Sequence, residues 1–236
     1  MQATIGILML DSQFPRIVGD VGNPATWGFT VDIEVVDNAT PHAVVRQGDD
    51  MLDAFIEAGQ RLVQRGVSGI ITSCGFLSIY QQELASALGV PVLTSSLMQV
   101  ASVNATLPVN KRAAILTISK SALKDKYLHA ANVPLDTPIG STEGGKEFSR
   151  RILNNEKTLN IELARQDNVN AAQALLATDS SIGALVLECT NMVPYAADIA
   201  AATGVPVYSM YNLVNWFQIS LMPPEFGDLS SNHHVI

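Results

Sequence analysis

The strongest constraint on the fold of this chain is an internal repeat that contains both of its cysteines, Cys74 and Cys189. Each cysteine is followed six residues later by a tyrosine and fifteen residues later by the tetrapeptide Gly-Val-Pro-Val. The two copies, residues 74–92 and 189–207, align without a gap at an offset of 115 residues, and eight of the nineteen positions are identical. A duplicated unit with one thiol in each copy predicts two similar lobes whose thiols face each other across a cleft.

Each cysteine directly follows a short apolar run of the kind that forms a buried strand. Similar β-rich runs alternate with amphipathic helical patterns along the chain, which is typical of α/β proteins with mainly parallel strands. The predicted fold is therefore α/β, with two pseudo-symmetric lobes, each a mainly parallel sheet flanked by helices, and an active site in the cleft between them. Strands are expected at residues 4–10, 32–37, 69–73, 91–93, 113–118, 184–187 and 207–208. Helices are expected at residues 51–63, 78–88, 119–129, 158–177, 195–202 and 212–221.

A polar segment that contains a proline, residues 104–112, is the expected boundary between the lobes. It divides the chain into an N-terminal lobe at residues 1–108, with the first cysteine, and a C-terminal lobe at residues 109–236, with the second. The last predicted helix, residues 212–221, is expected to pack back on the first lobe. The glycine-rich residues 140–145 are predicted to form a loop.

The composition of the 236 residues argues against several classes of partner. The net charge is −8 and Lys and Arg do not cluster, so we expect neither nucleic acid nor a membrane as a partner. No apolar run reaches the roughly eighteen residues of a membrane span, and the chain enters a strand without a basic leader, so a cytoplasmic location is predicted. Dinucleotide and phosphate-loop motifs and a Cys-x-x-Cys pair are missing from the sequence, and we expect no cofactor and no metal.

The ends of the predicted strands carry polar groups, which is where functional groups collect in parallel sheets. Besides the two cysteines, Asp11 and Thr117 lie at such ends. A helix follows each cysteine, and its free N–H groups are expected to lower the thiol pKa from the ordinary value of about 8.5. Two such thiols on opposite faces of a planar carbanion can remove a proton from one face and return one to the other, which inverts a carbon next to a carboxylate.

The sequence therefore predicts Cys74 and Cys189 as the catalytic acid and base. Their neighbours are predicted to bind the substrate or to stabilise the negative charge that develops on it. The competing interpretation is that both cysteines are buried relics of a duplicated core position and have no function. The predicted substrate-binding residues are Asp11, Gly75, Phe76, Thr117, Thr190 and Asn191.

The duplicated units of strand, cysteine and helix, with Cys189-Thr190-Asn191 in the second, resemble the aspartate/glutamate racemase superfamily. That superfamily includes cofactor-independent amino-acid racemases, hydantoin racemases, maleate isomerases and arylmalonate decarboxylases. Asp11-Ser12 is similar to the Asp-Ser pair after the first strand of glutamate racemases, and residues 19–26 are similar to the Gly-rich loop of aspartate racemases. The resemblance covers nearly the whole chain. It implies two α/β lobes, a homodimer, a small carboxylate substrate, and two cysteines acting as acid and base in a cleft.

Two positions depart from the glutamate racemase pattern. Those enzymes follow their first cysteine with Asn-Thr, where this chain has Gly75-Phe76. They follow their second cysteine with Thr-His, where Asn191 takes the place of the histidine. An aromatic side chain beside the first thiol fits poorly with recognition of a charged α-amino group, and Cys74-Gly75-Phe76 is nearer to the hydantoin racemase pattern.

The function predicted from the sequence is a cofactor-independent racemase or epimerase, an isomerase of amino-acid metabolism that acts at the carbon α to a carboxylate of an amino acid or related small acid. A hydantoin racemase remains an alternative. So does a decarboxylase or cis–trans isomerase of small dicarboxylates that has the same fold and uses one cysteine. A further alternative is a protein that binds a small acid without catalysis.

Overall fold

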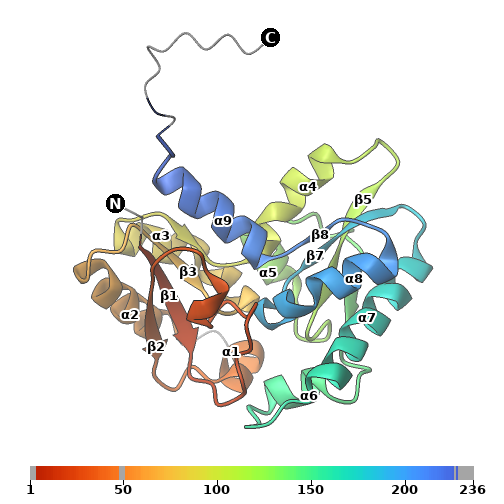
Figure 1. Cartoon of the computed structure of the whole chain (residues 1–236), viewed down its shortest axis with the longest axis horizontal. Coiled ribbons are helices and arrows are strands. Elements are labelled where there is room, and N and C mark those ends of the chain that lie inside the picture. Colours follow the sequence, from red (N-terminus) through yellow and green to blue (C-terminus); the bar gives the residue numbers. More distant parts are fainter. Residues whose placement is uncertain (1–3, 48–50, 226, 228–236) are drawn as a thin grey trace.

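The computed structural model of the chain describes residues 4–47, 51–225 and 227. The strands are β1 (Ile5–Leu10), β2 (Val31–Val36), β3 (Gly69–Thr72), β4 (Val92–Leu93), β5 (Arg112–Thr117), β6 (Ile139–Ser141), β7 (Ile182–Leu187) and β8 (Val207–Tyr208). They form two sheets with the orders β2-β1-β3-β4 and β6-β5-β7-β8, and the paired strands are parallel (Figure 1). The same topology thus occurs twice, which confirms the predicted two-lobe α/β fold.

Helices flank both sheets. They are α1 (Pro41–Gln47), α2 (Leu52–Gln64), α3 (Gln81–Leu88), α4 (Val100–Thr106), α5 (Asp125–Ala130), α6 (Phe148–Leu153), α7 (Ile161–Thr178), α8 (Ala196–Thr203) and α9 (Met210–Leu221). In the first lobe α2 packs on β1 and β2, because Phe55, Ala58 and Leu62 form a buried apolar stripe along it. In the second lobe α7 packs on β5, β6 and α8. Within the described residues, no helix combines the length and the hydropathy that crossing a membrane requires.

The repeated Gly-Val-Pro-Val motif connects a helix to a strand in each lobe. Gly89 and Gly204 cap the C-termini of α3 and α8 with φ angles of 67° and 71°. Side chains are strained at these angles, so glycine is the favoured residue at both positions. The proline two residues later precedes β4 or β8, which are edge strands, where the missing N–H of proline costs little.

Two helices cross between the lobes and join them. Helix α4 follows the first sheet but packs against β5 of the second, where Asn104 Oδ1 accepts a hydrogen bond from Ala113 N at 2.7 Å. Helix α9 follows the second sheet, but its buried side chains share an apolar cluster with Ile5 and Ile71 of the first (Figure 1). Each lobe therefore carries a helix that the chain supplies from the other lobe.

The structure differs from the expected elements in several places. Strand β6 overlaps residues 140–145, which the sequence predicts as a loop. Gly140 packs on Leu175 of α7, where an added Cβ would meet the Leu175 Cβ at 2.9 Å. Packing against the distant helix α7 therefore determines that these residues form a strand. The sequence also does not predict α1, α4 and α6, and the segments after the cysteines begin with 3-10 helices at Gly75–Tyr80 and Thr190–Tyr195.

Candidate active site

Both cysteines lie at equivalent strand ends and line the same cavity between the lobes. Cys74 follows β3 and Cys189 follows β7, and these free thiols are 9% and 6% exposed. The carboxyl ends of the strands in both sheets point into this region, as is usual for sites in parallel α/β sheets. The residues that line the cavity are Leu10, Phe14, Pro41, Val45, Ser73, Cys74, Phe76, Ile118, Ile152, Leu153, Glu188, Cys189, Thr190 and Asn191.

The cavity is small, and most of its walls are apolar. Its volume is about 20 Å³, which is close to the space that a single water molecule needs. Hydrogen bonds between the lobes hold the walls together. Thr190 Oγ1 donates to Ser73 O at 2.6 Å, and Ser96 Oγ donates to Leu187 O at 2.6 Å. The cavity is therefore closed in this structure, and it must widen before a small acid can enter.

The surroundings of Cys74 are mostly apolar. Burial, together with the negative charge of Glu188, raises the pKa of the Cys74 thiol to about 12. Three groups oppose this rise in pKa: the backbone N–H groups of Phe76 and Leu77, which donate to the sulfur, and the positive charge of Arg16. Burial outweighs all three.

More negative charge surrounds Cys189. Burial raises the pKa of its thiol well above the ordinary value, and the negative charges of Glu188 and Asp20, and of Cys74 when it is ionised, add to the rise. A hydrogen bond from the backbone of Asn191 lowers the pKa. The thiol also donates from Sγ to Asn191 Oδ1 at 3.5 Å, an interaction that only the protonated sulfur makes.

These pKa shifts correct the expectation that both thiols have lowered pKa values. The expected N–H donors are present at both sulfurs, but the closed cavity removes water from the thiolates. Desolvation of a charged sulfur costs more free energy than one or two hydrogen bonds return. In the closed structure both cysteines are therefore thiols at neutral pH.

One residue that lines the cavity, Glu188, was not among the site residues predicted from the sequence. Glu188 directly precedes Cys189, is 0% exposed, and lines the cavity. Burial raises its pKa to about 7, against a hydrogen bond from Thr117 and one from the backbone of Ile118. Thr117 Oγ1 donates to Glu188 Oε2 at 2.7 Å, whereas Oε1 has no hydrogen-bond partner in the described residues. A charged residue at the end of an apolar strand was the available signal in the sequence.

A second buried carboxylate supports the Cys189 side. Asp20 accepts hydrogen bonds from Arg16 Nη1 at 2.8 Å, Gly22 N at 2.8 Å and Asn191 Nδ2 at 2.5 Å. Arg16 also donates to Ser12 Oγ at 2.9 Å, while its Nε has no partner in the described part of the chain. The glycine loop at residues 19–26 thus brings an ion pair next to the second cysteine, which its sequence alone did not reveal.

Three of the six predicted substrate-binding residues line the cavity: Phe76, Thr190 and Asn191. Thr190 uses its hydroxyl to bind the Ser73 carbonyl, and the amide of Asn191 lies between Asp20 and the Cys189 thiol. These polar groups are therefore committed to the closed structure, and their contact with a substrate stays a prediction.

The other three predicted residues are not among those that line the cavity. Thr117 donates its hydroxyl to Glu188. Gly75 packs directly against Glu188, since an added Cβ would overlap the Glu188 carboxyl and carbonyl oxygens. Asp11 donates from its backbone N to Ala39 O at 3.1 Å. The contacts of Thr117 and Gly75 position Glu188, and the role of Asp11 in binding stays a prediction.

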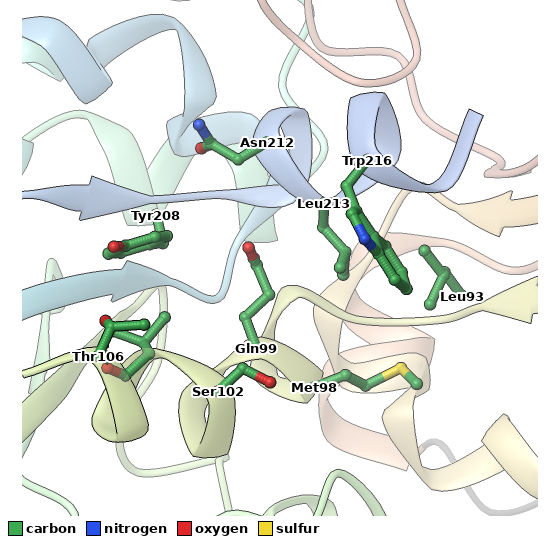
Figure 2. Close-up of a pocket in the computed structure, with 10 residues that line it drawn as sticks. Leu93, Met98, Gln99, Ser102, Thr106, Tyr208, Asn212, Leu213 and Trp216 are labelled. Carbon is green, nitrogen blue, oxygen red and sulfur yellow. Dashed lines mark hydrogen bonds between the residues drawn. The ribbon is translucent and has the colours of Figure 1, made fainter. Parts of the chain in front are cut away.

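A larger hollow of about 400 Å³ lies away from the cysteines, between α4 and α9 (Figure 2). Figure 2 shows Trp216 and Leu213 on one side of it and Ser102 and Thr106 on the other. Neither cysteine lines it, and it holds no side chain that the predicted chemistry requires. Among the residues that the structure describes, no group of three or more His, Cys, Asp or Glu side chains is placed to hold a metal ion.

The curated proteins to which this chain is similar include several dimethylsulfoniopropionate lyases. No family model matches the chain. It is 27% identical over 234 residues to a dimethylsulfoniopropionate lyase of Durusdinium sp. clade D, covering 95% of this chain and 77% of that protein. It is 29% identical over 238 residues to dimethylsulfoniopropionate lyase 3 of Emiliania huxleyi (strain CCMP1516), covering 95% of this chain and 61% of that protein. The chain is thus shorter than these relatives and spans less than two thirds of the second.

Solved structures agree with the two-lobe fold. A mutant of arylmalonate decarboxylase in a sulfate-associated form superposes with a TM-score of 0.63 at 15% identity, covering 92% of each chain. Glutamate racemase from Francisella tularensis subsp. tularensis SCHU S4 in complex with D-glutamate superposes with a TM-score of 0.57 at 15% identity, covering 95% of this chain and 84% of that one. The chain therefore has the fold of the aspartate/glutamate racemase superfamily, as the cysteine repeat predicted.

Proposed function

We propose that this protein is an enzyme that uses a cysteine to remove the proton from the carbon α to a carboxylate, and that its reaction is a β-elimination. The substrate class is a small zwitterion with one carboxylate and a cationic leaving group, of which dimethylsulfoniopropionate is the example. The observation that carries this proposal is the 27–29% identity to dimethylsulfoniopropionate lyases over 95% of the chain. The cavity that both thiols line supports the proposal, because a β-elimination of this substrate class requires a base that removes the α proton.

The elimination balances without any other reagent. A thiolate takes the α proton, and the electron pair of that C–H bond forms the new carbon–carbon double bond. The sulfonium leaves with the electron pair of its bond to the β carbon, as neutral dimethyl sulfide. The products are dimethyl sulfide, acrylate and one proton. A cationic leaving group accepts the electron pair readily, so the negative charge that develops at the α carbon never accumulates.

The charges around the cavity favour a zwitterion over a dicarboxylate. Arg16 is balanced by Asp20, with which it forms a buried ion pair. Glu188 adds negative charge when it is ionised, and burial holds its pKa at about 7. A second carboxylate on the substrate would meet this negative charge in a medium where charges interact strongly. A sulfonium is attracted instead, and its methyl groups match the apolar walls formed by residues such as Phe76 and Ile152.

A racemase or epimerase, including a hydantoin racemase, is the second candidate. One specific observation favours it: two thiols line one cavity, and inversion needs a proton donor on the face opposite the base, whereas elimination needs one base only. The apolar Gly75-Phe76 pair beside the first thiol argues for a substrate without a charged α-amino group, and the ring nitrogen of a hydantoin is uncharged.

The test is turnover by the purified chain in D₂O. With dimethylsulfoniopropionate, we expect dimethyl sulfide by gas chromatography and acrylate by NMR in equal amounts. The double variant Cys74→Ser/Cys189→Ser is the negative control. Loss of optical activity with deuterium at the α carbon of an unchanged hydantoin or amino acid, and no dimethyl sulfide, would establish the racemase instead. Release of CO₂ from 2-substituted malonates would establish a decarboxylase. Binding without any turnover would overturn both enzymatic candidates.

A further inference from the structure

We propose that Glu188 is a positioning residue that exchanges a proton with the Cys74 thiol, so that the reactive thiolate forms inside the closed cavity. This inference deepens the proposed function and rests on it for its activity readout, but it also has a readout that needs no substrate. Neither the racemase resemblance nor the predicted site included this residue.

The position of the carboxyl group is the first argument. In the chain, Glu188 precedes Cys189. In space, its Oε1 lies against Gly75, the residue that follows Cys74, so closely that no Cβ fits between them. The carboxyl group thus lies against the residue next to Cys74, and Glu188 lines the same cavity as both cysteines. Its other oxygen, Oε2, accepts the hydrogen bond from Thr117, while Oε1 has no hydrogen-bond partner in the described residues.

The absence of a compensating cation is the second argument. A buried carboxylate with a structural role usually forms an ion pair or several hydrogen bonds. Among the described residues, Glu188 forms no ion pair, and its hydrogen-bond donors are the Thr117 hydroxyl and the backbone N–H of Ile118, while Oε1 has no partner. Arg16, the cation that acts on Cys74, is held by Asp20 and Ser12. A purely structural position would be occupied at lower cost by glutamine or leucine, so the carboxyl group has a use that depends on its proton.

The protonation states of the thiols supply that use. Both thiols are protonated in the closed cavity, so a base must remove a proton there before either can act. Glu188 is the group that lines the cavity with an intermediate proton affinity, since burial raises its pKa to about 7. Carboxyl and thiol titrate as a coupled pair, because protonating Glu188 removes one of the charges that keep Cys74 protonated.

The proton transfers balance at every step. Glu188 starts as a carboxylate and Cys74 as a thiol. The carboxylate takes the thiol proton, which gives a neutral acid and a thiolate at constant net charge. The thiolate takes the α proton of the substrate and becomes a thiol again. When the cavity opens, Glu188 releases its proton to water, which is the one proton produced in each turnover.

The experiment compares Glu188→Gln with a matched carboxyl variant, Glu143→Gln. Glu143 lies outside the cavity and binds Ser119, Ser121 and Ser141. In wild type, kcat/KM for dimethylsulfoniopropionate is expected to rise with pH through about 7. Glu188→Gln is expected to lose this rise and to lower kcat/KM by about 100-fold or more, as loss of a general base typically does. Glu143→Gln is expected to keep both the rate and the profile.

Thr117→Val makes the pH profile a sharper test. Removing this hydroxyl takes away a hydrogen bond that lowers the Glu188 pKa. The rise of kcat/KM is therefore expected to move to higher pH. A profile that stays in place in Thr117→Val, or a Glu188→Gln enzyme with the wild-type rate and profile, would overturn the role of Glu188.

Infrared difference spectroscopy of the substrate-free protein separates this inference from the proposed function. Wild type is expected to lose the carbonyl band of a protonated carboxylic acid as the pH rises through about 7, and Glu188→Gln is expected to lack that band. If the band is present but no dimethyl sulfide forms, the proposed elimination fails while Glu188 keeps its proton role at the thiols. If dimethyl sulfide forms and the band is missing in wild type, the inference fails and the elimination stands.

Discussion

The two cysteines occupy equivalent positions in two equivalent lobes, yet their surroundings differ. Cys74 has two backbone N–H donors and the positive charge of Arg16 to stabilise a thiolate. Cys189 has one backbone donor and is near the charge of Asp20, and its thiol donates a hydrogen bond to Asn191 Oδ1. Gene duplication alone would give two similar half-sites. This difference leads us to expect separate tasks for the lobes, with Cys74 as the thiol that is more easily deprotonated and Cys189 as the thiol that keeps its proton.

Single serine variants test this division of tasks with the largest expected effect. Cys74→Ser is expected to lower kcat/KM for elimination by roughly 10⁴-fold, because a hydroxyl is a far weaker acid than a thiol. Cys189→Ser is expected to lower it only by about 10-fold to 100-fold, since elimination needs one base. Kinetics of dimethyl sulfide release give both values. Equal losses in the two variants would break the comparison, because elimination would then depend on both thiols alike.

The pH dependence of the free energy of unfolding tests the protonation of Glu188, the residue that precedes Cys189. The folded-state pKa of Glu188, about 7, lies above the ordinary glutamate value of 4.5. A raised pKa means that the folded state binds the proton more tightly, so this stabilisation is complete below about pH 4.5 and is lost as the pH rises through 7. The free energy of unfolding of wild type is expected to fall across this range relative to Glu188→Gln, by on the order of 3 kcal/mol.

Urea denaturation at several pH values measures this difference. Glu143→Gln is the control, because hydrogen bonds from Ser121, Ser119 and Ser141 outweigh its burial and lower the Glu143 pKa to about 2. That pKa lies outside the window from 4.5 to 7, so this variant is expected to follow wild type there. Parallel curves for wild type and Glu188→Gln would show that the carboxyl group has an ordinary pKa.

The contact between Gly75 and Glu188 is the point where the two half-sites meet, and a methyl group there has an intermediate expected effect. Gly75→Ala is expected to displace the Glu188 carboxyl group and to lower kcat/KM by about 10-fold or more. Gly144→Ala is the control, since nothing lies within 4 Å of an added Cβ at that position. In the Glu188→Gln background the effect of Gly75→Ala on the rate is expected to shrink, because the two residues act together. Additive effects would mean that they act independently.

Alkylation of the thiols has the smallest expected effect. Both are buried and protonated, so iodoacetamide is expected to label them more slowly than a free cysteine. Cys74 is expected to react a few-fold faster than Cys189, because its thiolate is the better stabilised. Peptide mass spectrometry over time measures both rates. Faster labelling of Cys189 would reverse the assignment of acid and base.

Much of the fold could be predicted because its signals are local. The apolar runs before Cys74 and Cys189, and the left-handed glycines at 89 and 204, specify strand, turn and helix within short stretches of sequence. Strand β6 could not be predicted, since it depends on contact between Gly140 and the distant Leu175. At the site, the thiols and three neighbours were placed at the cavity from the sequence, whereas Glu188, Asp20 and Arg16 were not.

The sequence by itself determined that the chain has two lobes of one topology and that a thiol ends an inner strand in each. Only the tertiary structure decided the protonation of those thiols. Their pKa values depend on how completely the opposite lobe excludes water and on which charges it brings near, and Glu188 meets Gly75 only after both lobes have folded. Sequence neighbours reveal which donors a thiol has, but the desolvation that outweighs those donors comes from residues far away in the chain.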